Sequence, residues 1–300
     1  MNDQTWLPAE VKDRQLPFIR CEGLVRIYKA LDLEVMALQG LDLTVKAGEM
    51  VAIIGSSGSG KTTLLNILGA LDTPSAGLAM VGGWNLARMS PRERVLYQRQ
   101  VVGFVWQNVG RNLVPYLTAL ENVEVPMILN GKPNRAWARE LLEVVGLERC
   151  AHHRPSQMSS GQLQRVAIAI GLANRPKLLL ADEPTGALDS KSARQVLQVM
   201  RDIRATYGVT IVLVTHDRMI VRAVDRYVEI RDGRIVTETV RRAPGAVKTW
   251  LDETETHDEY VVLDAAGRLQ LPIEYRKALG ISTHARIMLR EREIVIRPKD

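Results

Sequence analysis

One short run of residues has the composition and spacing to hold phosphate groups. Residues 55–62 read Gly-Ser-Ser-Gly-Ser-Gly-Lys-Thr, which fits the pattern G-x-x-x-x-G-K-[ST]. The glycines let successive backbone N–H groups turn toward one anion, and the N-terminus of a following helix adds partial positive charge. Lys61 can then reach the β- and γ-phosphates of ATP, while the Thr62 hydroxyl can bind Mg²⁺. The candidate nucleotide-binding residues of this run are Gly55, Ser56, Ser57, Gly58, Ser59, Gly60, Lys61, Thr62 and Thr63.

Two adjacent carboxylates follow a second apolar run, residues 178–181. Phosphoryl transfer needs a carboxylate that holds hydrated magnesium and a group that positions water, normally at the end of a neighbouring strand. Asp182 is the candidate for the metal, and Glu183 is the candidate general base that polarises the attacking water. A solvent-facing acidic pair is the alternative for these two residues taken alone. Beside a phosphate loop, the catalytic interpretation is favoured, and ATP hydrolysis is the predicted reaction.

His216 follows a third apolar run, residues 210–215. Parallel pairing of these strands would deliver His216 to the same carboxyl edge of the sheet, where it could sense the γ-phosphate. A lone histidine is more often structural, so this role is a hypothesis. Lys61, Gln107, Glu183 and His216 are the candidate catalytic residues, and Thr62, Gln107 and Asp182 are the candidate metal ligands.

The elements that must position these groups alternate between strands and helices, which indicates an α/β fold with a largely parallel sheet covered on both faces. Residues 108–175 are mostly helical in pattern and rich in arginine, and they predict a helical insert. Prolines at 115, 126, 133, 155 and 176 are expected to divide this stretch into short pieces. The predicted strands are residues 50–54, 101–106, 178–181 and 210–215, and the predicted helices are residues 62–68 and 190–206.

Bulk composition limits the remaining classes. The 300 residues are 46% apolar, which suffices for one large domain and a smaller one. No apolar run approaches the roughly 18 to 20 residues of a membrane span, and the N-terminus lacks the layout of a secretory signal, so a cytoplasmic location is expected. Two distant cysteines indicate neither a disulfide framework nor a zinc site. The net charge of +6 is compatible with an anionic partner without identifying one.

Four further features follow in a characteristic order. Tyr28 precedes the phosphate loop, Gln107 follows the second predicted strand, residues 158–162 read Met-Ser-Ser-Gly-Gln, and residues 186–189 read Gly-Ala-Leu-Asp. Together with the phosphate loop and the carboxylates, these features resemble the ATP-binding-cassette (ABC) ATPases over residues 18–238. The resemblance implies a P-loop fold with a mixed sheet core and a helical subdomain. It also implies that Tyr28 stacks on adenine and that Gln107 touches Mg²⁺ and couples to a membrane partner.

The same resemblance implies a homodimer in which two copies enclose two ATP molecules. Ser159 and Gly161 would contact the γ-phosphate bound by the other copy, through a hydroxyl and backbone donors at a helix N-terminus. The family usually has two glycines where this chain has Ser160 and Gly161, so closure or turnover could be weakened. The residues expected to complete the partner's nucleotide site, or to bridge the two copies, are Ser159, Ser160, Gly161, Gln162 and Asp189.

Residues 113–126 are similar to the subgroup that serves macrolide exporters, lipoprotein-releasing complexes and cell-division ATPases. Those complexes use ATP to move periplasmic or extracellular parts. The resemblance implies a separate integral membrane permease of the FtsX or MacB type, with this chain peripheral on the inner face of the membrane. The loop at 108–112 looks longer than the usual subgroup loop that touches the membrane partner, so partner identity is the least constrained inference.

The last 43 residues differ in character, and residues 262–280 resemble the swapped-hairpin domains of AbrB/SpoVT transition-state regulators and of antitoxins. That family dimerises by exchanging strands, and many members bind DNA through exposed arginines, which Arg268, Arg276 and Lys277 match. Residues 258–300 hold eight Lys or Arg and seven Asp or Glu, a net charge of +1, so a dimer clamp is favoured over a DNA reader. The predicted tail elements are strands at 259–263 and 268–271, a turn at 265–267, a helix from Pro272 to Gly280, and a hairpin of residues 285–290 and 293–297.

The predicted division of the chain has four segments. They are an N-terminal extension (1–17), the ATPase domain (18–238, with the helical subdomain at about 108–175), a linker (239–257) and the β-rich C-terminal domain (258–300). Three functions remain open at this point. The first is an ATPase subunit beneath a membrane permease, the second is a soluble ATP-switched DNA-binding regulator, and the third and weakest is a repair or translation ATPase.

Overall fold

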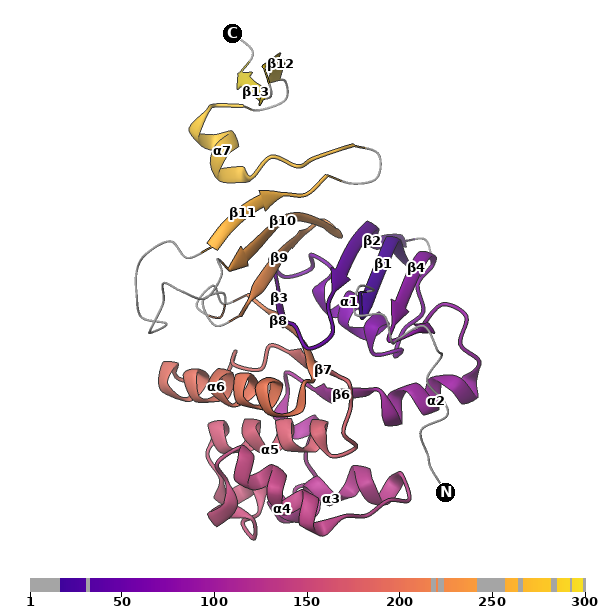
Figure 1. Ribbon diagram of the computed structural model, residues 1–300, viewed down its shortest axis with the longest axis vertical. Helices are drawn as coiled ribbons and strands as arrows, with labels where there is room; N and C mark the ends of the chain where they lie inside the picture. The colour runs from indigo at the N-terminus through magenta and orange to yellow at the C-terminus, as the bar shows by residue number, and fades with distance from the viewer. Residues whose placement is uncertain are drawn as a thin grey trace.

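The computed structural model describes residues 17–30, 33–216, 220, 224–241, 257–263, 267–281, 285–291 and 293–298. Two sheets lie next to each other, helices α3 to α5 form one end of the molecule, and α7 with β12 and β13 extends from the opposite end (Figure 1). No helix in these ranges is both long enough and apolar enough to cross a membrane.

A seven-stranded sheet forms the centre, in the order β11-β10-β9-β3-β8-β7-β6. Neighbouring strands from β9 to β6 are parallel, whereas β10 pairs antiparallel with both β9 and β11. The four predicted strands are confirmed, and the antiparallel edge makes the sheet mixed, as the resemblance implied. The bounds are β3 (Met50–Ile54), β6 (Val102–Val105), β7 (Leu178–Asp182), β8 (Thr210–Thr215), β9 (Arg226–Arg231), β10 (Arg234–Arg241) and β11 (His257–Val261).

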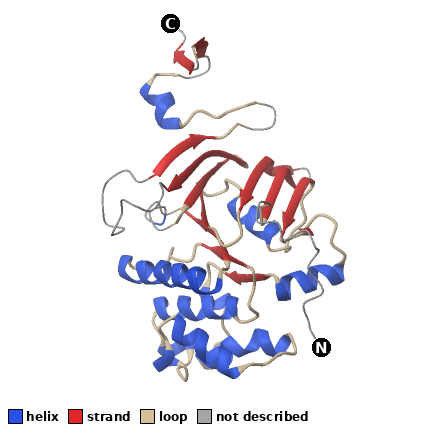
Figure 2. Cartoon of the chain, in the orientation of Figure 1, coloured by secondary structure: helices blue, strands red, loops and turns tan. Residues whose placement is uncertain are grey.

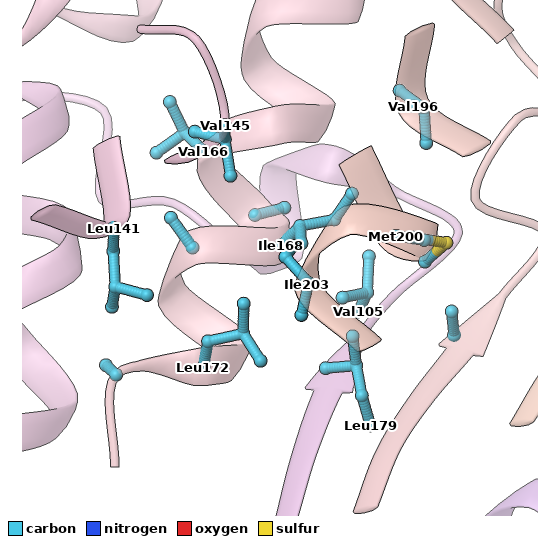
Figure 3. Close-up of a cluster of buried hydrophobic side chains, with 14 of the residues drawn as sticks. Val105, Leu141, Val145, Val166, Ile168, Leu172, Leu179, Val196, Met200 and Ile203 are labelled. Carbon is cyan, nitrogen blue, oxygen red and sulfur yellow. The ribbon is translucent and has the colours of Figure 1, made fainter. Parts of the chain in front are cut away.

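The central strands are apolar along their whole length because both faces of the sheet are covered. Alternate residues of β3 enter different cores: Ala52 joins the cluster beneath the helical subdomain, and Val51 and Ile53 join the cluster around α1. Figure 3 shows the first cluster, where Leu141 and Ile168 of the helices lie with Leu179 of β7. This two-sided burial fixes the ends of β3, β6, β7 and β8 at one edge of the sheet.

A second sheet of four antiparallel strands was not predicted from the sequence. Its order is β2-β1-β4-β5, with β1 (Ile19–Ala30), β2 (Leu33–Val45), β4 (Ala76–Val81) and β5 (Trp84–Asn85). Three register shifts interrupt the pairing of β1 with β2, one of them between Arg26 and Ile27. Such bulges break the two-residue alternation by which a strand is recognised. The bulge opposite Arg26 and Ile27 leaves Ala37 unpaired between Met36 and Leu38.

The helices agree with the predicted periodicity, and the helical insert is confirmed between β6 and β7 in the chain. The α-helices are α1 (Lys61–Leu68), α2 (Pro91–Gln100), α3 (Ala119–Leu129), α4 (Arg135–Val144), α5 (Ser160–Leu172), α6 (Ser190–Tyr207) and α7 (Ile273–Ala278). Short 3₁₀ helices are η2 (Val109–Arg111), η3 (Glu148–Cys150) and η4 (Pro155–Gln157).

One predicted break is wrong, because Pro126 lies inside α3 rather than ending it. Thr118 and Glu121 form a reciprocal capping box at the N-terminus of α3, which satisfies two backbone donors of the first turn. Leu120 and Met127 are buried on one side of the helix. Packing and capping therefore offset the hydrogen bond that proline cannot donate.

The tail begins as part of the large sheet. β11 pairs with β10 from Thr237↔Val261 to Arg241↔His257. The predicted helix and hairpin are present as α7, β12 (Ala285–Arg290) and β13 (Glu293–Pro298), shown in Figure 2. The predicted strand at 268–271 is wrong, since this stretch has only the isolated bridge Leu263↔Leu269. The domain boundaries at 239 and 258 remain predictions, and most of the predicted linker lies outside the described residues.

Candidate nucleotide-binding site

An open hollow of about 420 Å³ lies where the parallel strands end. The phosphate loop follows β3, Gln107 follows β6, the carboxylates end β7, and His216 follows β8. The sheet thus brings together groups that are far apart in the sequence, as the parallel pairing predicted. The lining residues are Val35, Met36, Ala37, Ser57, Gly58, Gly60, Lys61, Thr62, Thr63, Gln107, Asp182, Glu183 and His216.

The phosphate loop is closed on itself by its lysine. Lys61 Nζ donates to the carbonyl oxygens of Gly55 and Ser56, at 2.9 and 2.8 Å. Burial lowers the pKa of the Lys61 ammonium, and the nearby carboxylates of Glu183 and Asp182 oppose that change. The ammonium is therefore a partly desolvated cation whose present partners are neutral carbonyls. An incoming triphosphate offers it stronger, charged acceptors.

Asp182 and Thr62 present an oxygen pair beside the loop. The Thr62 side chain is hydrogen-bonded to the Asp182 carboxyl group, which is only 7% exposed. Burial, and then the neighbouring Glu183, raise the pKa of Asp182, while Lys61 and Thr62 act in the opposite direction. The hollow thus contains a hydroxyl beside a buried carboxylate, and it also contains the Gln107 amide. These groups supply the hard oxygen donors that suit Mg²⁺.

Glu183 is held at both carboxylate oxygens. Gln107 Nε2 donates to Glu183 Oε2 at 3.1 Å, and His216 Nδ1 lies 2.9 Å from Oε1. The backbone of Glu183 is in the left-handed region with φ of +46°, and its N–H donates to the Val214 carbonyl of β8. This uncommon conformation for a non-glycine residue turns the side chain away from the strand and into the hollow.

Comparison with known proteins agrees with this geometry. A family described as ABC transporter matches residues 38–186. MacB, a macrolide export ATP-binding/permease protein, is 45% identical over 229 residues in Brucella melitensis, covering 75% of this chain and 35% of the relative. The homologue from Azoarcus is 46% identical over 225 residues, covering 74% of this chain and 34% of the relative. The chain thus spans about a third of the length of these curated relatives.

The structural match is more complete. The dimeric, post-hydrolysis structure of the ATP-binding cassette MJ0796, bound to ADP and Pi, is 40% identical with a TM-score of 0.67. It covers 73% of this chain, and this chain covers 97% of the cassette. The chain belongs to the ABC ATPase family. It is an ATP hydrolase that uses Mg²⁺, and nothing in the comparisons favours the DNA-binding regulator.

The signature residues of the cassette lie outside the hollow, at the N-terminus of α5. Ser159 caps α5 and accepts from the Gln162 N–H, while the Gln162 side chain accepts from the Ser159 N–H. Ser160 is exposed at the first helical position and stands in place of the first of the two expected glycines, while the second is retained as Gly161. Gly161 packs tightly on α6, because a Cβ there would lie 3.1 Å from Ser192 Oγ. The hollow and the signature are two separate surfaces of one copy.

Two predicted nucleotide contacts have other partners in this copy. Asp189 caps α6 by accepting from the N–H groups of Lys191 and Ser192, and these bonds, with the Ser192 hydroxyl foremost, lower the pKa of Asp189. The Tyr28 hydroxyl donates to Asp72, and Tyr28 is not among the lining residues. Gly55, Ser56 and Ser59 also lie outside the lining residues of the hollow.

Three residues that line the hollow, Val35, Met36 and Ala37, were not predicted from the sequence. Val35 and Met36 are 58% and 49% exposed, which is unusual for apolar residues of a strand. The Ala37 bulge turns this part of β2 against the phosphate loop, since a Cβ on Gly60 would lie 2.5 Å from the Ala37 carbonyl. No motif marks these residues, because the approach of β2 depends on tertiary structure.

Proposed function

We propose that this ATPase drives a separate membrane permease and is held by it at the inner face of the membrane. The supporting observation is the position of Gln107. Its side chain contacts the catalytic carboxylate, and its backbone leads directly into the loop that presents Tyr116 to solvent. A permease that moves this loop would therefore move a partner of Glu183.

Exposed apolar side chains lie before and at the end of α3, in the part of the chain that follows Gln107. Tyr116 is 72% exposed, and Ile128 and Leu129 at the end of α3 are 58% and 70% exposed. Buried Asn122 fixes the preceding loop by accepting from the Val114 N–H and donating to nearby carbonyls, so Tyr116 sits on a rigid turn. Exposed apolar side chains on a rigid support are typical of docking surfaces.

Co-expression with candidate permeases tests this docking. The wild-type chain should co-purify with its permease in detergent, whereas Tyr116→Ser and Leu129→Asp should reduce recovery and leave the ATPase rate of the isolated chain unchanged. Leu71→Asp is the matched control, because Leu71 is 47% exposed but lies outside the helical insert. Failure of the wild-type chain to co-purify with any co-expressed permease contradicts the proposal.

The residues of the hollow can carry out hydrolysis with little rearrangement. Lys61 exchanges the carbonyls of its own loop for phosphate oxygens, and Thr62 and Asp182 provide the oxygen ligands for Mg²⁺, which neutralises phosphate charge when bound. Glu183 accepts a proton from the attacking water as the water oxygen bonds to the γ-phosphorus and the bond from that phosphorus to the bridging oxygen breaks, leaving ADP and phosphate. Each oxygen of Glu183 has one of these partners, Gln107 or His216, and keeps a second lone pair that can accept from the attacking water.

We further propose that the site is completed by Ser159 and Gly161 of a second copy. The solvent-exposed cap of α5 offers a hydroxyl and the N–H groups of a first helical turn, which suit a phosphate. Two variants test this in one experiment. The Lys61→Ala copy keeps an intact signature, and the Ser159→Arg copy keeps an intact phosphate loop. When the two differently tagged copies are co-expressed, each heterodimer should therefore contain one active site. Activity no greater than that of either variant alone rules out a shared site.

The tail has a surface that suits a second tail, consistent with an AbrB-like swapped hairpin. One face of the β12–β13 hairpin is entirely apolar and includes Ile287, Leu289 and Ile294, which are 69%, 77% and 66% exposed. A two-stranded hairpin with such a face is not stable by itself. We propose that two tails pair and keep two cassettes together when ATP is absent, which raises their effective concentration.

Light scattering on nucleotide-free protein measures this pairing directly. The wild-type chain should have the mass of a dimer, and Leu289→Asp should give a monomer. Arg290→Asp, on the polar face of the same strand, is the control and should remain dimeric. A monomeric wild-type chain contradicts the clamp without affecting the ATPase assignment.

A further inference from the structure

Three side chains next to the hollow form a closed network that no catalytic step uses. The Tyr28 hydroxyl donates to Asp72 Oδ2 at 2.7 Å, and Arg26 Nε donates to the same oxygen at 2.9 Å. A second guanidinium nitrogen of Arg26 lies 2.8 Å from Asp72 Oδ1. The Arg26 guanidinium carbon also lies 4.5 Å from the centroid of the Tyr28 ring. The ring is thus held at its hydroxyl and along its plane.

The position of Tyr28 relates this network to the nucleotide. Tyr28 pairs with Val35 across β1 and β2, so their side chains are neighbours on one face of the sheet. Val35 lines the hollow, which also contains the phosphate loop. Tyr28 keeps 37% of its surface exposed, although Arg26 covers part of the ring. An aromatic ring therefore stands at the edge of the hollow, beyond Val35.

We propose that Arg26 and Asp72 are positioning residues that hold the Tyr28 ring as a platform for the base of ATP. This inference rests on the proposed ATPase function and on the adenine stacking that the family resemblance implies for Tyr28. Asp72 fixes the hydroxyl, and the Arg26 cation fixes the plane of the ring. A ring that is already oriented loses less conformational freedom when a base stacks on it, so the network strengthens base binding without contacting the base.

The network is stronger than an ordinary surface ion pair. Arg26 and Asp72 are 24% and 19% exposed, whereas the Arg20–Glu22 pair on the same strand is 45% and 55% exposed. Asp72 also accepts from the Thr73 N–H, which fixes its carboxylate after α1. The network therefore joins β1 to the segment that follows the phosphate-loop helix α1.

Steady-state ATPase assays and calorimetry test the proposal. Tyr28→Ala should raise KM for ATP by about tenfold or more, the loss expected for one stacked base, and Arg26→Ala should raise it about three- to tenfold. In both variants kcat should stay within about twofold, because the phosphate chemistry is untouched. Arg20→Ala on the same strand is the matched control and should leave KM unchanged.

Two further readouts separate positioning from a structural effect. The dissociation constant for magnesium tripolyphosphate, which lacks a base, should be the same in wild type and Arg26→Ala. In the Tyr28→Ala background, Arg26→Ala should raise KM no further, since the arginine acts through the ring. Arg26→Lys, which keeps the charge, should recover part of the affinity.

The outcomes distinguish the two levels of inference. If the Arg26→Ala variant has the KM of the wild type, the positioning role of Arg26 and Asp72 is overturned, while the ATPase assignment is unaffected. An equal loss of tripolyphosphate binding, or a full additional loss in the double variant, also overturns that role by showing a general structural effect. Absence of ATP hydrolysis by the wild-type chain would instead overturn the proposed function.

Discussion

Gly60 allows no side chain, and the consequence can be estimated from its surroundings. A Cβ at this position would lie 2.5 Å from the Ala37 carbonyl oxygen and 2.9 Å from Leu38 Cδ2. Its φ of +105° is also unfavourable for any L residue. We expect Gly60→Ala to cost about 3 kcal/mol, roughly 1 from the backbone and 2 from the clash with β2. That corresponds to a loss of about 6 to 12 °C in Tm for a domain of this size.

Gly58 in the same loop isolates the clash. It has φ of +78°, but no neighbouring heavy atom lies within 4 Å of the place that a Cβ would take, so Gly58→Ala should cost only about 1 kcal/mol, or roughly 2 to 4 °C. Thermal unfolding of the two variants without nucleotide, followed by circular dichroism, gives the comparison. Equal losses in Tm would refute the argument that the Ala37 bulge excludes a side chain from Gly60.

Three other changes test the support of the site. Tyr97→Phe removes a buried hydroxyl that donates to the Leu68 carbonyl at the end of α1 at 2.6 Å, and should lower Tm by an amount corresponding to about 1 to 2 kcal/mol in thermal unfolding. Arg226→Met leaves the Glu49 carboxylate without its 2.7 Å partner and should lower the free energy of unfolding by about 3 kcal/mol. The double variant with Glu49→Met should recover part of this loss. Asp182→Asn should abolish hydrolysis yet raise Tm at pH 7. The folded-state pKa of Asp182 is raised, so the protonated carboxyl stabilises the fold at low pH, and this contribution is lost as pH rises through that pKa. The gain from the asparagine should therefore shrink as pH falls and vanish below the ordinary aspartate pKa of 3.8. An unchanged gain at both pH values would contradict this sign.

The chemistry of the site was predictable because it is encoded locally and at strand ends. The phosphate loop needs only a strand, glycines and a helix, all within residues 50–68. Glu183 and His216 each follow a buried apolar run, and parallel pairing places such ends at one edge. Patterns of this kind can be recognised in the sequence without knowledge of the tertiary structure.

The rest depends on contacts between distant segments. The approach of Val35 to the hollow requires a bulge whose position no local pattern marks. The hydrogen bond from Tyr28 to Asp72 joins residues 44 positions apart, so no local pattern could predict it. The local propensity of Pro126 predicts a break in the helix, whereas the burial of Leu120 and Met127 against the core lets α3 continue through it.

The initial rate of ATP hydrolysis by Glu183→Gln is the most direct test of the central claim, that Glu183 is the base facing the phosphate loop. The amide keeps the size of the side chain and can still hydrogen-bond His216, but it cannot accept the proton of water. We predict that ATP still binds, while turnover falls by about a hundredfold or more, within the range that general-base catalysis contributes. Turnover within about threefold of wild type would contradict the assignment and require another base.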